Sequence, residues 1–479
     1  ADYFNGMEDE NIVQAIPNEK ASEWMEENIP LFECPQHNFE EMYYYRWWSL
    51  RKHIKETPVG YGMTEFLVQR SYSDKYNLIA CAIGHHIYES RWLRDPKYLD
   101  QIIHTWYRGN DGGPMKKMDK FSSWNADAVL ARYMVDGDKD YLLDMKKDLE
   151  TEYQRWERTN RLKNGLYWQG DVQDGMEESI SGGRRKKYAR PTINSYMYGN
   201  AKALSCIGIL SGDEGMAMKY GMRADTLKNL VENELWNTRH QFFETMRTDS
   251  SANVREAIGY IPWYFNLPDT TQKYEIAWKE IMDEKGFSAP YGLTTAERRH
   301  PEFRTRGVGK CEWDGAIWPF ASAQTLTAMA NFMNNYPQTV LSDSVYFRQM
   351  ELYVESQYHR GRPYIGEYLD EVTGYWLKGD QERSRYYNHS TFNDLIITGL
   401  IGLRPRLDNT IEVNPLIPAD KWDWFCLDNV LYHGHNLTIL WDKNGDRYHC
   451  GKGLRIFVDG KEVGQANTLT KIVCENALK

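Results

Sequence analysis

The sequence contains no long apolar run and no long basic tract. No stretch approaches the roughly 20 apolar residues that a membrane-spanning helix needs. The net charge of −10 over 479 residues is modest, and the basic residues are dispersed, which argues against nucleic-acid binding. We therefore expect neither a membrane span nor a nucleic-acid partner.

The chain also lacks a recognisable signal peptide, and it begins with Ala1 rather than methionine. From this we expect a secreted or periplasmic protein whose signal segment is absent from this chain. A cytoplasmic location stays open.

Cysteine is sparse, and no two cysteines have the Cys-x-x-Cys spacing of zinc and redox sites. Zinc and redox motifs of this kind are therefore absent, and we expect no metal. We also expect no cofactor. The odd number of cysteines, seven, indicates that most are free. Cys426, Cys450 and Cys474 lie close enough along the chain to leave one disulfide open.

Aromatic residues, in contrast, are abundant: 33 Tyr and 17 Trp bring the aromatic fraction to 14%. Such a composition excludes a disordered chain. Two explanations fit it, a carbohydrate site lined by rings and a large aromatic core. The length favours one large domain with an appendage.

Helical runs alternate with short turns through most of the sequence. Residues 79–88, 129–134 and 203–210 are each followed by a break that contains an aspartate able to cap the next helix. This recurrence favours stacked αα-hairpins.

The pattern changes to that of strands near residue 405, where short apolar runs with a period of two begin, and Asp459-Gly460 is a strong hairpin signal. We predict three parts: an N-terminal arm (1–40), a helical domain (41–404) and a small antiparallel β module (405–479).

Two segments place acidic residues among rings. The stretch 364–376 contains Glu367 among tyrosines and Trp376, and the stretch 168–180 contains Glu177 and Asp174 after Trp168. Cleavage of a glycosidic bond needs two carboxyl groups, so the pair indicates a glycosidase. The alternative for the first stretch is an ordinary surface turn at 370–374.

These segments resemble those of the six-hairpin glycosidases, in particular glycoside hydrolase families 63 and 37, the mannosylglycerate hydrolase and trehalase relatives. Gly175 to Ser179 is similar to the family's acid segment, residues 367–374 are similar to its base segment, and residues 313–319 are similar to its Trp-Arg-Gly-Pro-hydrophobic-Trp segment.

The resemblance implies an (α/α)6 toroid, mainly α-helical, with a C-terminal antiparallel β module. It also implies an inverting, exo-acting hydrolase of oligosaccharides or polysaccharides, with Glu177 as general acid and Glu367 as general base. The chain departs from the family at two positions. Glu177 stands in place of Asp, which leaves Asp174 as a rival acid, and Asp314 stands in place of Arg.

Rings and polar groups near these segments are the candidates for substrate contacts. They are Arg46, Trp124, Trp168, Asp174, Trp313, Asp314, Trp318, Tyr364 and Tyr375. The basic loop 181–190 is either solvated or recognises a carboxylated or sulfated sugar through its guanidinium groups.

Two other functions stay open. A polysaccharide lyase or epimerase on the same toroid would use a Tyr or His base, with Arg neutralising a uronate. A non-catalytic glycan-binding protein would keep the cleft without turnover. The sugar, the linkage and the oligomeric state have no sequence signal.

Overall fold

The computed structural model describes residues 1–271, 273–307 and 311–478. Its α-helices are α1 Asp2–Asn5, α2 Ala21–Asn28, α3 His37–Arg51, α4 Ile83–Ser90, α5 Pro96–Arg108, α6 Asn125–Asp136, α7 Lys139–Asn160, α8 Pro191–Ser211, α9 Glu214–Leu230, α10 Ile261–Tyr264, α11 Pro319–Asn335, α12 Asp343–Ser356 and α13 Asn393–Leu395, which continues as one turn of π-helix. None of the helices in this described part combines the length and the apolar character that crossing a bilayer requires.

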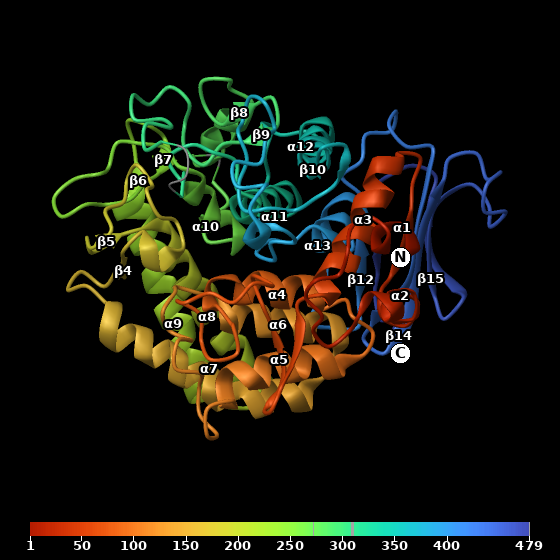
Figure 1. Ribbon diagram of the computed structural model, residues 1–479, viewed down its shortest axis with the longest axis horizontal. Coiled ribbons are helices and arrows are strands. Elements are labelled where there is room, and N and C mark those ends of the chain that lie inside the picture. Colours follow the sequence, from red (N-terminus) through yellow and green to blue (C-terminus); the bar gives the residue numbers. More distant parts are fainter. Residues whose placement is uncertain (272, 308–310, 479) are drawn as a thin grey trace.

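Six helices form a closed inner ring. Contacts run from α4 to α6, α8, α10, α11 and α13, and α13 closes the ring on α4. A second helix packs outside most members: α5 on α4, α7 on α6, α9 on α8 and α12 on α11. The inner helix α8 is buried along most of its length, whereas the outer helix α7 buries one stripe. The expected (α/α)6 toroid is thus the observed fold (Figure 1).

Glycine and aspartate separate the helices as the sequence indicated. Helices α6 and α8 end at Gly137 and Gly212, which both have a left-handed φ of 72°. The side chains of Asp138 and Asp213 then accept the backbone N–H of the third residue onward at 3.0 Å, which caps α7 and α9. The predicted breaks between helices, each with an aspartate that caps the next helix, are confirmed.

The C-terminal module is an antiparallel sheet of order β1-β13-β14-β15-β16 beside the pair β12-β17. Its strands are β1 Leu31–Glu33, β12 Ile411–Val413, β13 Trp424–Tyr432, β14 His435–Asp442, β15 Gly453–Val458, β16 Lys461–Ala466 and β17 Ile472–Cys474. Asp459 and Gly460 both have positive φ in the turn between β15 and β16, as a tight hairpin requires. The edge strand β1 comes from the segment that we expected to be a lead-in arm.

The remaining strands are short two-stranded ladders on the loops. They are β2 Ile54–Thr57 with β3 Gly60–Met63, β4 Trp168–Gln169 with β5 Tyr188–Ala189, β6 Trp236–Asn237 with β7 Phe242–Phe243, β8 Ser288–Ala289 with β9 Gly292–Leu293, and β10 Tyr358–His359 with β11 Arg362–Pro363. The ladders from β4 to β10 lie along the left and upper rim in Figure 1, and the β module lies at the right.

The aromatic abundance belongs mainly to the core. Of the 17 tryptophans, only Trp168 and Trp424 are not buried. The core explanation therefore accounts for nearly all of them. All seven cysteines are free, so the disulfide left open among the last three does not form.

Replacing Phe32 by alanine is expected to lower the free energy of unfolding by about 3–5 kcal/mol, because a buried phenylalanine leaves a cavity. Its ring lies 5.2 Å from that of Tyr43 in α3 and 6.1 Å from that of Trp422, so it joins the β module to the toroid. Chemical denaturation measures the change. The neighbouring Leu31, which is 41% exposed, is the control. Equal losses for Leu31→Ala and Phe32→Ala would contradict this role.

Candidate active site

The segment that contains Glu177 is a loop between β4 and β5, with one 3₁₀ turn at Val172–Asp174. Gly175 ends this turn with a φ of +72°. A Cβ at Gly175 would lie 2.3 Å from Cys81 Sγ, so only glycine fits without a shift. The expected turn at Gly175 is therefore present, and it leads directly into Glu177.

Asp174 is held by a buried ion pair. Its Oδ2 lies 2.6 Å from Arg190 Nε, and both side chains have almost no exposed surface. The hydroxyls of Ser122 and Thr192 also donate to Asp174. Its oxygens are thus occupied inside the protein, which corrects the expectation that Asp174 contacts the sugar or competes as the acid.

The loop that contains Glu367 follows β11. A Cβ at Gly366 would lie 2.7 Å from the rings of both Tyr364 and Trp376, so the backbone passes between the rings only because this residue is glycine. Leu369 and Ile317 exchange two backbone hydrogen bonds of 3.0 Å. The base loop and the segment 313–319 therefore form one unit.

Arg304 joins the same two loops through carboxylates. Its guanidinium lies 2.6 Å from Asp370 and 2.8 Å from Glu312, and it also pairs with Glu371. The turn at 370–374 that the sequence suggested is present, and Asp370 caps it. The two acids of this turn, Asp370 and Glu371, therefore have a structural role. Glu367 is the remaining acid of the loop, and Arg304 does not pair with it.

Glu367 is buried beside two cations. Its Oε2 lies 3.1 Å from Lys378 Nζ and 3.5 Å from a guanidinium nitrogen of Arg383. Lys378 is itself buried, with Nζ 4.8 Å from the centre of the Tyr368 ring. Lys378 and Arg383 thus give Glu367 partners that differ from the Arg304 partner of Asp370 and Glu371 in the same loop. Neither cation was predicted from the sequence.

Glu177 is half-buried and has the opposite electrostatic setting. Burial raises its pKa to about 7, and the negative charge of Glu367 contributes. The two carboxyl groups therefore lie close enough to interact. One of them keeps its proton up to neutral pH while the other lies against cations, which is the division of roles that acid–base catalysis needs.

Glu65 is a third carboxyl group at this site, and sequence reasoning missed it. Burial raises its pKa to about 8; the hydrogen bond from Tyr387 opposes the shift, and the charges of Glu367 and Glu177 add to it. The Tyr387 hydroxyl lies 2.7 Å from Oε1. Among the described residues, no donor bonds Oε2. The only sequence signal was an acid between Met63 and Phe66. We call Glu65, Glu177 and Glu367 the carboxyl cluster.

Trp313 and Trp318, expected to face the sugar, are both 3% exposed. Their rings stack at 4.5 Å, and Trp318 stacks on Tyr368 at 4.6 Å. Tyr368 directly follows Glu367 in the chain. The tryptophans therefore pack against the base loop inside the protein, and neither exposes a ring face on which a sugar could stack.

Three further candidates are buried in structural roles. Arg46 donates to Gln357 and to the carbonyl of Ser390, both at 2.7 Å. Trp124 is fully buried against other rings of the core. Asp314, also fully buried, accepts the backbone N–H of residue 306 at 2.9 Å. We expected these three side chains to contact the substrate. The structure corrects this expectation, because each is engaged within the protein.

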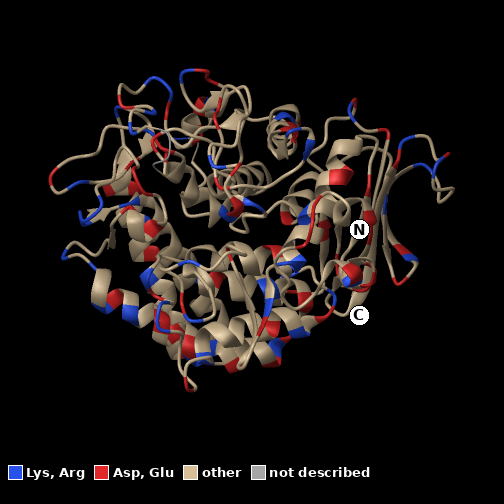
Figure 2. Cartoon of the chain, in the orientation of Figure 1, with Lys and Arg blue, Asp and Glu red and all other residues tan. Residues whose placement is uncertain are grey.

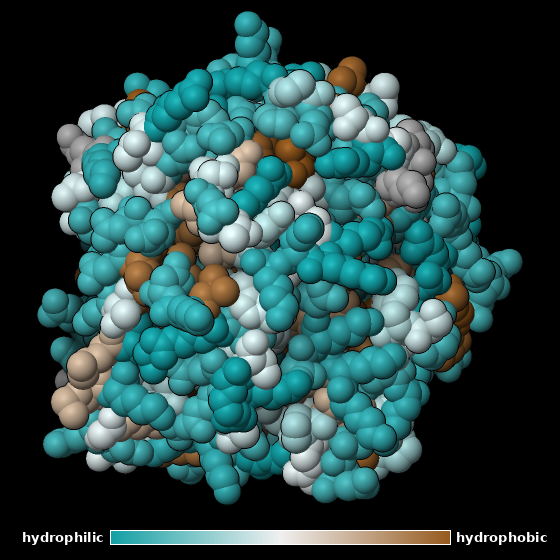
Figure 3. All heavy atoms as spheres, turned by 90° about the vertical axis from the view of Figure 1, so that its left-hand side faces the viewer, coloured by the Kyte–Doolittle hydropathy of each residue, from teal (hydrophilic) through white to brown (hydrophobic). Residues whose placement is uncertain are grey.

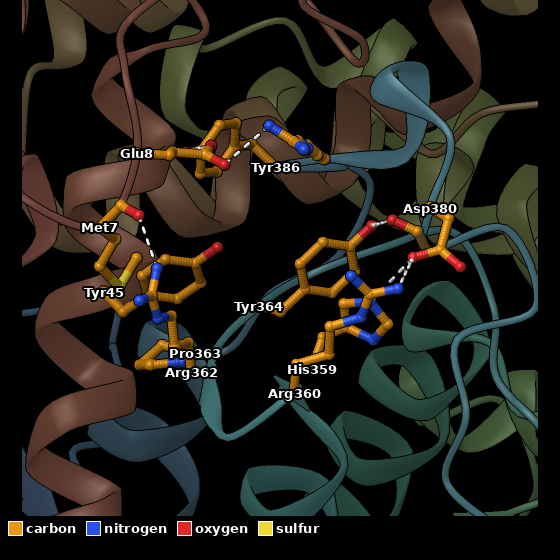
Figure 4. Close-up of a pocket in the computed structure, with 12 residues that line it drawn as sticks. Met7, Glu8, Tyr45, His359, Arg360, Arg362, Pro363, Tyr364, Asp380 and Tyr386 are labelled. Atoms are coloured by element: carbon orange, nitrogen blue, oxygen red, sulfur yellow. Dashed lines mark hydrogen bonds and ion pairs between the residues drawn. The ribbon is translucent and has the colours of Figure 1, made fainter.

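The remaining candidates lie beside open space. Tyr364 lines a cavity of about 640 Å³ whose wall also includes Arg360, Arg362 and Arg385 (Figure 4). Tyr375 is 47% exposed and donates to Asp380 at 2.7 Å. Trp168 lines a separate cavity of about 350 Å³. Within the described ranges, no group of three or more His, Cys, Asp or Glu residues is arranged to hold a metal ion.

The helical toroid and the paired carboxyl groups are features of the six-hairpin glycosidase superfamily. Residues 75–390 match the family described as the mannosylglycerate hydrolase MGH1-like glycoside hydrolase domain. This match spans well over half of the sequence, and the chain belongs to that family. Residues 403–464, in the β module, match the C-terminal domain of glycosyl hydrolase family 65. The predicted family resemblance is confirmed.

Solved structures agree on the fold. A chain named sialidase is 95% identical with a TM-score of 0.99; it matches all of this chain, which spans 44% of its length. The GH63 mannosylglycerate hydrolase from Thermus thermophilus in complex with glucose is 13% identical with a TM-score of 0.56, covering 74% of this chain and 99% of that one. The GH78 family rhamnosidase of Bacillus sp. GL1 is 11% identical with a TM-score of 0.60, covering 90% and 41%.

Replacing Glu65 by glutamine is expected to stabilise the protein at alkaline pH. In the folded state the pKa of Glu65 is about 8, above its value of about 4.3 in the unfolded chain, so stability is lost as pH rises between these values. Glutamine does not titrate and can still accept from Tyr387. The free energy of unfolding of the variant, relative to that of wild type, should rise by on the order of a few kcal/mol between pH 5 and pH 8.5. The difference in melting temperature between the two proteins should rise with it.

The control is Glu284→Gln, because Glu284 is exposed. Its melting temperature relative to wild type should stay constant over the same range. A Glu65→Gln difference that is also independent of pH would contradict the burial of an ionisable carboxyl group at this position.

Proposed function

We propose that this glycosidase is exo-acting and inverting, with Glu177 as the general acid and Glu367 as the general base. The observation that supports the assignment best is the contrast between the two carboxyl groups. Burial raises the pKa of Glu177 to about 7, whereas Glu367 forms ion pairs with Lys378 and Arg383. A proton donor and a proton acceptor can therefore coexist near neutral pH.

In the proposed reaction, Glu367 takes a proton from a water molecule while the oxygen of that water attacks the anomeric carbon. The bond from that carbon to the glycosidic oxygen breaks, and Glu177 gives its proton to the departing oxygen. Both side chains return to their starting state by proton exchange with solvent. No cofactor enters this reaction.

Inversion and exo action are supported by the family resemblance of the two carboxylate segments. Inversion places a water molecule between the base and the sugar, which calls for a separation of roughly 6.5–9.5 Å between the two carboxyl groups. The name sialidase belongs to a longer chain, of which this chain spans 44%. A sialylated oligosaccharide is therefore one arm of the substrate test.

The first experiment is a screen of plant, algal and host oligosaccharides, including sialylated ones, with products followed by NMR. Release of single terminal sugars supports exo-hydrolysis. An unsaturated product that absorbs in the ultraviolet would instead indicate a lyase. Binding without turnover on every member of the screen would indicate a glycan-binding protein.

Replacing Glu367 by glutamine is expected to lower kcat by about 10²–10⁴-fold, because glutamine cannot accept the proton of the attacking water. The melting curve should remain cooperative, since glutamine has nearly the same shape. Steady-state kinetics on the best substrate of the screen measures the loss. A folded variant with wild-type turnover would falsify the assignment of the base.

The acid is identified by its dependence on the leaving group. Glu177→Gln should nearly abolish cleavage of a natural glycoside, yet spare much of the activity on an aryl glycoside of the same sugar, because a good leaving group departs without protonation.

The matched control for this acid test is Asp174→Asn. This variant loosens the loop through Arg190 and should affect both substrates alike. If Asp174→Asn, rather than Glu177→Gln, shows the leaving-group dependence, the acid is assigned to the wrong residue.

A further inference from the structure

A basic pocket lies directly beside the acid segment. This cavity of about 350 Å³ is lined by Asp119, Lys120, Trp156, Asn160, Trp168, Gln169, Gly170, Gln173, Arg184, Arg185, Lys186 and Lys187. Figure 2 shows basic residues gathered around β4 and β5 at the left of the molecule. The surface on that side is predominantly hydrophilic, and its apolar patches are separate from one another, which suits a polar ligand better than an apolar one (Figure 3).

The positive charge of the basic pocket is mostly unneutralised. Its aspartate, Asp119, pairs with Arg155, and Arg184 lies 2.7 Å from Glu178. The other four cations, Lys120, Arg185, Lys186 and Lys187, have no carboxylate partner within the described ranges. The chain as a whole carries a net charge of −10, so this concentration of unpaired cations is local.

The larger cavity beside Tyr364 shows the contrast. Its three arginines are each satisfied at 2.7 Å, by Asp380, by the carbonyl of Met7 and by Glu8 (Figure 4). A charged ligand there would have to displace existing partners. In the basic pocket, Lys120 donates to the carbonyl of Tyr72 at 3.3 Å, but Arg185, Lys186 and Lys187 have no anionic partner in the part of the chain that the structure describes.

A ring and amide groups complete the basic pocket. Trp168 is one of the two tryptophans outside the buried core, and Lys187 Nζ lies 4.3 Å from the centre of its ring. An indole face packs against the apolar face of a sugar, the amides of Gln169 and Gln173 supply polar groups, and cations bind a carboxylate or sulfate. These are the elements that recognise an anionic carbohydrate.

The position of the basic pocket relates it to the reaction. Gly170 and Gln173 line it; Gly170 lies just before the 3₁₀ turn that leads to Glu177, and Gln173 lies within that turn. The half-buried Lys120 is close enough to Glu177 for their charges to interact. A general acid lies on the side of the sugar that departs, so a ligand next to this segment occupies the leaving-group side.

We infer that the basic pocket binds a negatively charged sugar unit on the leaving-group side of the scissile bond. This inference rests on the proposed function for its place in the reaction, but the binding itself does not depend on turnover. Arg184 of the basic loop 181–190 is already paired with Glu178, so the discriminating cations are Arg185, Lys186 and Lys187.

The experiment uses titration calorimetry on the full chain with Glu367→Gln, so that ligands are not consumed. The ligands are a panel of uronic-acid oligosaccharides, the same molecules with their carboxyl groups reduced, and a sulfated oligosaccharide. We expect an acidic ligand to bind about tenfold or more tightly than its reduced counterpart, the effect of one charge-assisted hydrogen bond. The advantage should decrease as salt is added. Preference for the sulfated ligand would identify sulfate as the anion.

The triple variant Arg185→Gln, Lys186→Gln and Lys187→Gln should remove this advantage. The control carries the same charge change on the β module, Lys443→Gln, Lys452→Gln and Lys461→Gln, all exposed, and should retain it. Equal losses in both triple variants, equal binding of acidic and reduced ligands, or no acidic ligand bound at about 10 mM would each overturn the inference.

Kinetics of the same triple variant on a wild-type background separates this inference from the proposed function. KM should rise about tenfold for an oligosaccharide whose leaving part is acidic and stay unchanged for an aryl glycoside. A rise for both substrates would overturn the leaving-group placement. Charge-dependent binding together with normal turnover in Glu367→Gln would overturn the proposed base and leave the anionic site standing.

Discussion

Pairing between guanidinium groups and carboxylates holds the candidate active site together, because the segments that carry its acids have almost no regular secondary structure. Arg190 fixes the acid segment through Asp174, and Arg304 joins the base loop to the segment before it through Asp370 and Glu312. Breaking a buried pair leaves an uncompensated charge, so each arginine constrains its loop strongly. The helices of the toroid hold the ends of these loops.

Those pairs also decide which acids remain for chemistry. Asp174 is a rival acid in the sequence, and Asp370 and Glu371 belong to the turn beside Glu367, but arginines already engage all three. Glu177 and Glu65 have no arginine at ion-pair distance in the described residues, and burial raises the pKa of both. Glu367 differs from both groups, because it is paired with Lys378 and lies 3.5 Å from a guanidinium nitrogen of Arg383. The site thus combines two carboxyl groups whose pKa burial raises, Glu177 and Glu65, with a third, Glu367, that lies beside cations.

Local signals in the sequence predicted the fold well. Asp138 and Asp213 cap helices as expected, and Asp459-Gly460 forms its hairpin, because caps and tight turns depend on neighbouring residues in the chain. The recurrence of helical runs separated by short turns then indicated stacked αα-hairpins. Strand β1 was missed because its pairing with β13 spans nearly 400 residues, and nothing in three residues signals such a partner.

The site was predicted less completely, for the same reason. Glu177 and Glu367 stand in segments with a family resemblance, whereas Glu65 and Lys378 join them only through the folded chain. The direction of a ring is likewise set by tertiary packing. The sequence predicts Trp313 and Trp318 as sugar contacts, yet they stack against each other and against Tyr368 of the base loop, and Trp124 belongs to the core. Composition indicated how many rings to expect but not which of them are exposed.

The configuration of the first product tests the central claim most directly. Proton NMR during the first turnovers on the best substrate distinguishes the two anomers before they interconvert. An acid at Glu177 and a base at Glu367, with water between the base and the sugar, predicts the inverted anomer. Release of the retained anomer would contradict this account, because it would require one of the carboxylates to act as a nucleophile and form a covalent intermediate with the sugar.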